Sequence, residues 1–404
     1  MRTIQSKVLT FLMWAALALT PNAAFSDTPE AQSIAAFVDE TLGAFSDQDG
    51  VLGLTLAVVS PNEGTILRGV GTADVRSGEP VDPEKHLFQI ASLSKTFVGV
   101  AIMQLAEQGL VDIDADIRTY LPNLPISETF NEPIRVRDLL AHRTGFEISQ
   151  SGLWHMTPEG VPTLSEYIQD YAPQRVWRPG ELTAYSNYGY SLAGRIVEVA
   201  SGMPFQDYLE AKIFLPLNMT STTARTPEDI GRGVMRAELQ KRLTPGHRSL
   251  AAGAAHRGFV YTPSAPAAGV VTTAKDMALY MKAHLNDGAG ETARIMLPET
   301  AKKMRARVYT DRPFEPDFAH GIEVRPYGDV KVVEHEGDMI YTMSLMAIAP
   351  DAGIGVFVSI NTSDGTEMNR EITTEIIQFA TALVEKSNPA RNQIKDAAPM
   401  DAPP

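Results

Sequence analysis

The chain has 404 residues, no cysteine and a formal net charge of -14 at pH 7. The lack of cysteine excludes disulfides, a thiol nucleophile and a cysteine zinc site. The acidic charge argues against a nucleic-acid partner, and it offers no attraction to an anionic membrane surface.

The first 26 residues have the pattern of a secretory signal peptide. A basic start leads into the apolar stretch 8–19, and the small residues Ala24 and Ser26 precede Asp27. Because the stretch is short for a membrane span, we expect cleavage before Asp27 and export, with the periplasm as the compartment. The alternative is an uncleaved N-terminal anchor. No later segment is long and apolar enough to predict a membrane span.

Strand-like segments lie near both ends of the remaining chain. Turn signals separate two such segments near the N-terminus and three near the C-terminus, and short connections favour antiparallel neighbours. The last strand is followed by a helix, because Ile372, Ile376 and Leu383 recur on one helical face. The five predicted strands are "VLGLTLAVVS", "GTILRGVGTADV", "VKVVEHEG", "IYTMSLMAIAP" and "GIGVFVSIN".

The middle of the chain is typical of helices with Gly or Pro near their ends. The predicted helices are "FVGVAIMQLAEQGL", "VRDLLAH", "LSEYIQDYA", "SLAGRIVEVASG", "FQDYLEAKIFLPL" and "AKDMALYMKAHLNDG".

This order predicts a mixed α/β (α+β) fold in one domain, residues 27–386. The N- and C-terminal strands would share one antiparallel sheet with flanking helices, giving a sheet lobe of about 27–91 and 318–386. A mostly helical lobe of about 92–317 would be inserted between them, and a cleft at the junction is a natural site. The Pro-, Ala- and Asp-rich tail, 387–404, is expected to be disordered.

Ser92 and Lys95 lie three residues apart at the start of an apolar run that ends near Gly109. In a helix they would share one face, and the serine would lie at the positive end of the helix dipole. A desolvated lysine amine is able to take the proton of a serine hydroxyl. The apolar surface of this run is so wide that we expect a buried helix. The S-x-x-K pattern alone is weak, and an ordinary Ser and Lys near a helix start are the alternative.

The segment "YSN" supplies a phenol at Tyr185 and an amide at Asn187. A phenol beside a lysine cation is able to relay protons, and an amide is able to bind a substrate carbonyl. The alternative is a turn tyrosine and an asparagine that caps the following helix.

His335 and Gly337 fall on a predicted strand. A glycine inside a strand marks close approach by a ligand or another backbone, and here it would let substrate lie along the strand. The backbone N–H groups of Asp338 and Ser92 could then form an oxyanion hole. A packed or exposed strand histidine is the alternative reading of His335.

The order S-x-x-K, Y-x-N, H-x-G resembles the serine β-lactamase and penicillin-binding protein superfamily. The resemblance is greatest to the branch of class C β-lactamases and D-Ala-D-Ala carboxypeptidase B, with related esterases and D-aminopeptidases. It covers about Thr55 to Thr362. Further segments that look like this family are "GLVDIDADIRTYLPNLP", "VRDLLAHRTGF", "RPGELTAYSNYGYSLAG", "IFLPLNMTST" and "PAAGVVTTAKDMALYM".

The resemblance implies a β-lactamase/transpeptidase-like fold and a serine hydrolase that needs no cofactor. Ser92 would be the acylated nucleophile, and Lys95 and Tyr185 would share the acid and base work. Asn187 would help to bind the substrate amide. Which residue is the acylation base stays open.

The strand motif, often Lys-Thr-Gly in this family, is here the stretch Glu334-His335-Glu336-Gly337-Asp338. The implied substrate-binding residues are His335 and Gly337, and many relatives that are not lactamases have His there. Strand alternation puts the three acidic residues on the other face, so not all of them need face substrate. The acidic stretch is nevertheless a poor site for a substrate carboxylate.

We therefore expect an exported serine hydrolase that acts on an ester, an amide or a D-amino-acid peptide. A small-molecule ester, a peptide or a cell-wall-like compound would be the substrate. A D-Ala-D-Ala carboxypeptidase or a class C-like β-lactamase is the alternative, and a penicillin-binding-like receptor without turnover is an alternative of another class. No metal site is expected, since His247 and His256 lack ligand spacing, and we expect His142 to be structural.

Overall fold

The computed structural model describes residues 32–46, 52–248, 255–309, 317–362 and 365–387. The predicted signal peptide lies outside these residues. The predicted tail also lies outside them except for Ser387, which is the last residue of the final helix.

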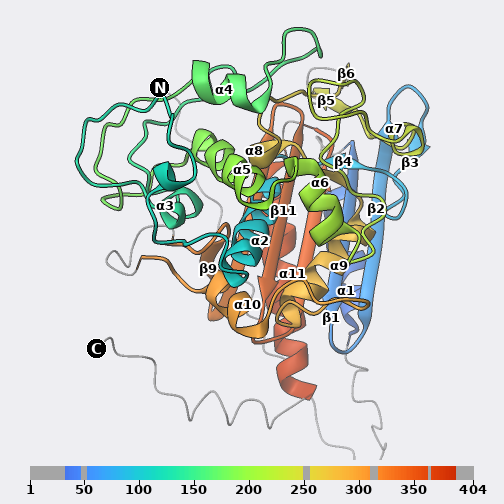
Figure 1. Ribbon diagram of the computed structural model, residues 1–404. Coiled ribbons are helices and arrows are strands. Elements are labelled where there is room, and N and C mark those ends of the chain that lie inside the picture. Colours follow the sequence, from blue (N-terminus) through green and yellow to red (C-terminus); the bar gives the residue numbers. More distant parts are fainter. Residues whose placement is uncertain (1–31, 47–51, 249–254, 310–316, 363–364, 388–404) are drawn as a thin grey trace, which may run out of the picture. The chain divides into compact units, whose positions relative to one another are not determined.

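One eight-stranded antiparallel sheet joins the two ends of the chain (Figure 1). Its order is β3-β2-β1-β12-β11-β10-β9-β8, so N-terminal β1 pairs directly with C-terminal β12. This arrangement confirms the predicted fold class. The strands are β1 (Gly53–Ser60), β2 (Gly64–Asp74), β3 (Glu79–Pro80), β8 (Asp317–Phe318), β9 (Glu323–Tyr327), β10 (Val330–Met339), β11 (Thr342–Ala349) and β12 (Ile354–Ile360).

Helices and short strand pairs between β3 and β8 form the helical part of the molecule. The helices α2 (Ser94–Glu107), α3 (Val136–Leu140), α4 (Leu164–Asp170), α5 (Asn187–Ser201), α6 (Phe205–Leu209) and α9 (Ala274–Leu285) coincide with the six predicted ones. The others are α7 (Ala237–Gln240), α8 (Ala265–Ala268) and α10 (Pro298–Arg305), with short helical turns η1 (Ala91–Leu93), η2 (Ile117–Thr119) and η3 (Glu210–Phe214). The short strand pairs are β4 (Phe88–Gln89) with β7 (Val271–Thr272), and β5 (Gly246–Arg248) with β6 (Ala255–Gly258).

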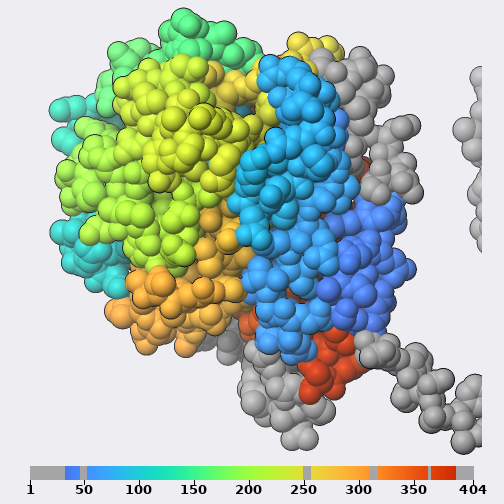
Figure 2. All heavy atoms as spheres, turned by 90° about the vertical axis from the view of Figure 1, so that its right-hand side faces the viewer, coloured from blue at the N-terminus to red at the C-terminus, as the bar shows by residue number. Residues whose placement is uncertain are grey.

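The two faces of the sheet carry separate apolar cores, because neighbouring strand residues point to opposite sides. On β1, Leu56 and Val58 face the terminal helices α1 (Ile34–Ser46) and α11 (Thr366–Ser387), whereas Ala57 and Val59 face the helical part. The rings of Phe37 and Phe379 stack 4.0 Å apart between the two terminal helices. In Figure 2 the edge strand β3 and its neighbour β2 belong to the lighter-blue region beside yellow-green residues of the helical part.

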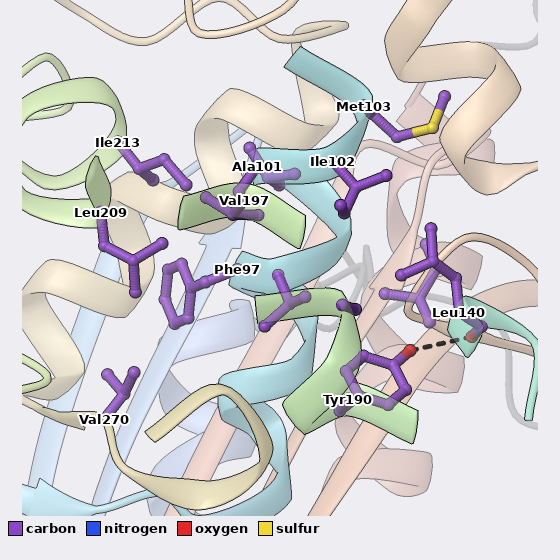
Figure 3. Packing of buried hydrophobic residues seen from close by; sticks show 14 of the residues in the cluster. Phe97, Ala101, Ile102, Met103, Leu140, Tyr190, Val197, Leu209, Ile213 and Val270 are labelled. Carbon is purple, nitrogen blue, oxygen red and sulfur yellow. Dashed lines mark hydrogen bonds between the residues drawn. The ribbon is translucent and has the colours of Figure 1, made fainter. Parts of the chain in front are cut away.

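Helix α2 is buried on nearly all sides, as its apolar sequence predicts. Its Phe97, Ala101 and Ile102 pack among residues of α5, α6 and η3 (Figure 3). A hydrogen bond of 2.8 Å from the Tyr190 hydroxyl to the carbonyl of Leu140 ties α5 to α3. This packing fixes the helix that begins two residues after Ser92.

Within the described ranges, none of the helices combines the length and apolarity needed to cross a bilayer.

His284 on α9 should make folding stability sensitive to acid. It is buried, its ring lies edge-on to Tyr280 at 4.5 Å, and burial lowers its pKa to about 3. The unfolded side chain has a pKa of about 6.5, so the unfolded state binds the proton first as the pH falls below that value. Keeping His284 neutral should therefore lower the free energy of unfolding increasingly as the pH falls from about 6.5 towards 3, by about 2–3 kcal/mol at pH 4.5.

We expect His284→Leu to lose less stability than the wild type between pH 7.5 and pH 4.5, measured by urea unfolding. The substitution also changes the packing around residue 284, but this effect is the same at both pH values and cancels when the two stability losses are compared. Equal losses in the two proteins would show that His284 is not the acid-sensitive group.

Candidate active site

Ser92 lies in a short helical turn that connects β4 to α2. The sequence predicted Ser92 at the first turn of the helix, but α2 begins at Ser94 and the preceding residues form η1. Ala91 has a φ of 48°, an uncommon conformation for a residue with a side chain. Strain of this kind persists only where surrounding contacts hold it.

Hydrogen bonds to a neighbouring segment hold this turn in place. The backbone N–H of Ile90 donates to the carbonyl of Val270 at 3.1 Å, and the Ser94 hydroxyl donates to the carbonyl of Ala91 at 2.7 Å. The Ser94 hydroxyl oxygen also accepts the backbone N–H of Val270 at 3.0 Å. The turn is therefore fixed before any substrate binds, and Ser92, which is half-buried, borders the pocket.

Lys95 is fully buried, and its Nζ contacts three oxygen atoms. These are Oγ of Ser92 at 2.9 Å, Oδ1 of Asn187 at 2.8 Å and the carbonyl oxygen of Ala267 at 2.8 Å. A neutral amine has two N–H bonds and one lone pair. The amide and backbone oxygens are acceptors only, so they take the two N–H bonds and leave the lone pair facing the Ser92 hydroxyl.

The pKa values of the two candidate acid–base residues move in opposite directions. Burial lowers the pKa of Lys95 well below its usual range, because the charged form loses its hydration. Burial raises the pKa of Tyr185 well above its usual range, while a hydrogen bond with Ser92 opposes that rise. The lysine thus favours the neutral amine and the tyrosine keeps its proton.

The imidazole ring of His142 packs against the ring of Tyr185. The two rings stack with centroids 4.2 Å apart, and Nδ1 of His142 accepts the backbone N–H of Ser186 at 3.0 Å. This bond leaves the ring proton on Nε2, an atom without a hydrogen-bond partner among the described residues. Burial lowers the pKa of His142 well below its usual range, so the ring stays neutral.

Asn187 is the first residue of α5 and is buried. The capping residue is Ser186, whose hydroxyl accepts the N–H of Gly189 at 3.0 Å, so the capping role we considered for asparagine belongs to its neighbour. The Asn187 amide is left to bind Lys95, and it also borders the pocket.

His335 is neutral and presents an unprotonated nitrogen. Its Nδ1 lies 2.6 Å from the backbone carbonyl of Glu336, an acceptor, so Nδ1 carries the proton and Nε2 has the lone pair. Among the described residues Nε2 has no hydrogen-bond partner. Burial lowers the pKa of His335 to about 3. His335 therefore carries no charge near pH 7.

Gly337 allows β10 to approach the turn that holds Ser92. A Cβ atom at this position would lie 2.1 Å from the carbonyl oxygen of Ile90 and 3.3 Å from the nitrogen of Leu93. We expected the missing side chain to make room for substrate, but the space is occupied by protein backbone. The same approach places Asp338, the next residue, at the pocket wall with Ser92.

Glu334 and Glu336 reach Arg370 on α11, as strand alternation predicted, but Glu336 and Asp338 also line the pocket, so the prediction that they lie on the other face is wrong for these two residues. The carboxylate of Glu334 is buried against Arg325 and the hydroxyl of Tyr327, and Arg370 on α11 pairs with both Glu334 and Glu336. This network leaves only part of the acidic stretch in contact with the pocket.

The pocket in front of Ser92 has a volume of about 440 Å³. Its wall includes Glu323, Glu336 and Asp338 but no Lys or Arg of the described chain. Burial raises the pKa of Glu323, while its partner Arg325 opposes the rise. Partial desolvation and the neighbouring Glu336 raise the pKa of Asp338. Apolar side chains complete the wall, namely Ile148, Trp154, Met339 and Ile340.

In the described parts of the chain, no group of three or more His, Asp and Glu residues is arranged to hold a metal ion. His247 and His256 lie close together, with ring centroids 5.9 Å apart.

Residues 38–381 match the profile of the beta-lactamase family. This chain belongs to that family. It is 26% identical over 287 residues to a beta-lactamase of Yersinia enterocolitica, covering 70% of this chain and 68% of that protein. It is 25% identical over 350 residues to the D-alanyl-D-alanine-carboxypeptidase/endopeptidase AmpH of Escherichia coli K12, covering 81% and 85%.

Among solved structures, the chain resembles the D-amino acid amidase of Ochrobactrum anthropi SV3 complexed with L-phenylalanine amide. The TM-score is 0.69 at 25% identity, covering 86% of this chain and 96% of that one. The predicted superfamily, the fold and the enzyme class, a serine hydrolase, are thereby confirmed.

The structure brings the sequence-predicted residues Ser92, Lys95, Tyr185, Asn187 and His335 together at one pocket. Sequence reasoning did not find the stacking role of His142 or the acceptor carbonyl of Ala267. No spacing rule links either residue to Ser92, because both reach the site from separate segments.

The lone pair of Lys95 should control acylation, and this leads to a pH prediction. The neutral amine is the active form, so kcat/KM for a neutral ester should fall as the pH falls through the lowered pKa of Lys95. No inflection should come from His335 near pH 6.5.

Lys95→Ala and Tyr185→Phe should each slow acylation by about a hundredfold or more.

Stopped-flow acylation with a p-nitrophenyl ester over pH 5–9 would check these expectations, with circular dichroism as the folding control. The combined loss should be smaller than the product of the single losses, because the two groups act on one proton path. Fully multiplicative losses would contradict a shared path.

Proposed function

We propose that this protein is an exported serine hydrolase that forms an acyl-enzyme on Ser92 and cleaves esters or amides, including D-amino-acid peptides, whose leaving group has no carboxylate. The observation that carries the proposal is the contact of the buried Lys95 amine with the Ser92 hydroxyl at 2.9 Å, with both N–H bonds of the neutral amine occupied by other oxygens.

In the first step, Lys95 accepts the hydroxyl proton as Oγ of Ser92 attacks the substrate carbonyl. A bond forms between Oγ and the carbonyl carbon, and charge develops on the carbonyl oxygen. The backbone N–H groups of Ser92 and Asp338 are the proposed donors to that oxygen, since both residues line the pocket. Asn187 orients Lys95 and offers its amide to the substrate.

The tetrahedral intermediate then expels its leaving group. The bond from carbon to the leaving nitrogen or oxygen breaks, and the departing atom takes a proton. Tyr185 is suited to deliver it, because its raised pKa keeps the phenol protonated, and the proton that Lys95 took from Ser92 then returns to the phenol, whose ring lies 4.9 Å from the amine. Water attacks the acyl-enzyme in the second half-reaction, and the acid leaves as Ser92 recovers its proton.

The pocket supports a substrate with hydrogen-bond donors and without a carboxylate near β10. Neutral His335 adds no positive charge to the pocket, and Glu323, Glu336 and Asp338 supply carboxylates at its wall. A substrate carboxylate would meet repulsion, whereas an amide N–H or a protonated amine would find acceptors.

Export is proposed from the signal-like pattern of residues 1–26, with the periplasm as the compartment. A D-Ala-D-Ala carboxypeptidase, a β-lactamase and a receptor without turnover are the competing activities.

Turnover at Ser92 separates an enzyme from a receptor. The wild type should show a burst followed by sustained release of p-nitrophenol from a neutral ester, because water can hydrolyse the acyl-enzyme. Ser92→Ala should keep its fold yet lose labelling by a fluorophosphonate. Ser127→Ala, which changes an exposed serine that does not line the pocket, is the matched control for labelling.

A single stoichiometric burst without further release would instead show a receptor. Equal labelling of the Ser92→Ala variant would remove Ser92 from the chemistry.

Matched substrates test the leaving-group preference. The wild type should cleave a C-terminally amidated D-peptide with a higher kcat/KM than the same peptide with a free carboxylate, at fixed pH and salt. The double change His335→Lys with Glu336→Thr should narrow or reverse the preference, since it adds a cation and a hydrogen-bond donor. A wild-type preference for the free carboxylate would return the carboxypeptidase or β-lactamase activity to first place.

A further inference from the structure

His142 contacts the segment 184–186 both through its backbone and through its ring, although it does not line the pocket itself. Its backbone carbonyl accepts the N–H of Ala184 at 2.8 Å, and its Nδ1 accepts the N–H of Ser186 at 3.0 Å. Between these two hydrogen bonds its ring stacks on that of Tyr185, with centroids 4.2 Å apart and planes inclined by 27°. One residue therefore holds both backbone neighbours of Tyr185 and its aromatic ring.

These contacts are needed because Tyr185 lies in a loop immediately before α5, where neither a helix nor a strand holds its backbone. The phenol forms a hydrogen bond with Ser92, and Nζ of Lys95 lies 4.9 Å from the ring centroid. His142 thus supplies, from a different segment, the support that secondary structure does not give to this residue.

The imidazole of His142 is in turn held by other rings. Phe318 of strand β8 meets it edge-on, with centroids 4.7 Å apart and planes at 77°, and the ring of Tyr190 lies at 4.9 Å. His142 and Tyr190 are fully buried, and Phe318 is buried as well. Since a close-packed interior leaves little room for a ring to shift, these contacts oppose movement of the imidazole away from Tyr185.

The backbone of His142 is in an uncommon conformation. Four residues other than glycine have a positive φ in the described part of the chain, and two of them adjoin the site: Ala91, which precedes Ser92, and His142, with a φ of 55°. Such strain persists only where the surrounding structure holds it, and it gathers at functional sites. The strained positions thus support the proposed nucleophile and the proposed acid.

We propose that His142 is a positioning residue, which holds the Tyr185 phenol where it protonates the leaving group. The inference rests on the proposed function. As the bond from carbon to the departing atom breaks, the proton passes from the phenol oxygen to that atom, and Lys95 returns a proton to the phenolate. His142 exchanges no proton; it fixes the distance over which the transfer occurs, and transfer requires hydrogen-bond reach.

Two variants of the full-length protein separate the contacts. His142→Asn keeps a side-chain acceptor and tolerates a positive φ, but it loses the stacked ring. His142→Phe keeps a ring but leaves the N–H of Ser186 without its acceptor. Each variant is compared with the wild type on a p-nitrophenyl ester and a methyl ester of the same acid, with kcat/KM measured from acid release in a pH-stat.

Both variants should lose about tenfold to a hundredfold in kcat/KM for the methyl ester, the scale of a misplaced catalytic group. The loss for the p-nitrophenyl ester should be smaller, because p-nitrophenolate is a better leaving group and depends less on protonation. In a Tyr185→Phe background, His142→Asn should cause little further loss, because the phenol that it would misplace is absent.

His284→Asn is the matched control, since His284 is a buried histidine on α9 that does not line the pocket. It should lower stability without changing the ratio of kcat/KM for the two esters. Urea unfolding establishes that each variant is folded under the assay conditions.

Equal losses for the two esters would show that His142 supports only the fold or the pocket as a whole, and the proposal would be wrong. Unchanged kinetics in both variants, or a full further loss in the Tyr185→Phe background, would also overturn it. The wild type tests the proposed function in the same assay: a wild type that cleaves neither ester would refute the function and this role together, whereas the outcomes above refute the role alone.

Discussion

The burial of one amine, that of Lys95, is the constraint on which the site depends. A fully buried lysine is strongly biased towards its neutral form, because the interior does not replace the lost hydration of the ammonium group. Its two acceptors, Asn187 and the carbonyl of Ala267, belong to α5 and α8. These helices must therefore be placed to within a few tenths of an ångström of α2, and close apolar packing around α2 supplies that placement.

Strand β10 contributes residues to the site on one face and forms ion pairs with α11 on the other. His335 and Gly337 face the turn that holds Ser92, while Glu334 and Glu336 reach Arg370 on α11. A shift of one residue in its pairing with β11 would exchange the two faces and place the ion network in the pocket. The buried pair of Glu334 with Arg370 opposes such a shift, because it would leave both charges without partners.

Much of this arrangement could be predicted from the sequence because it rests on local patterns. The alternating or apolar runs gave all five main strands, and the helical runs gave the six predicted helices. The candidate catalytic residues were identified from three short motifs whose order resembles that of a known family. The turn at Ala91 was missed, because a positive φ in a residue other than glycine leaves no sequence signal. The contacts of His142 with Tyr185 and Ser186 were missed as well, because they depend on distant backbone segments and not on side-chain spacing.

The carboxylates at the pocket wall also bear on the chemistry of Tyr185. Glu323, Glu336 and Asp338 each raise the pKa of this phenol, after the larger effect of burial. The same charges would by themselves favour the ammonium form of Lys95, but burial is the cause that sets the direction of its pKa. Two of the three carboxylates are paired with Arg325 and Arg370, which limits their reach. The proposed exclusion of a substrate carboxylate by this acidic wall is thus compatible with a neutral Lys95, and the same wall favours the protonated form of Tyr185 that the proposed acid role requires.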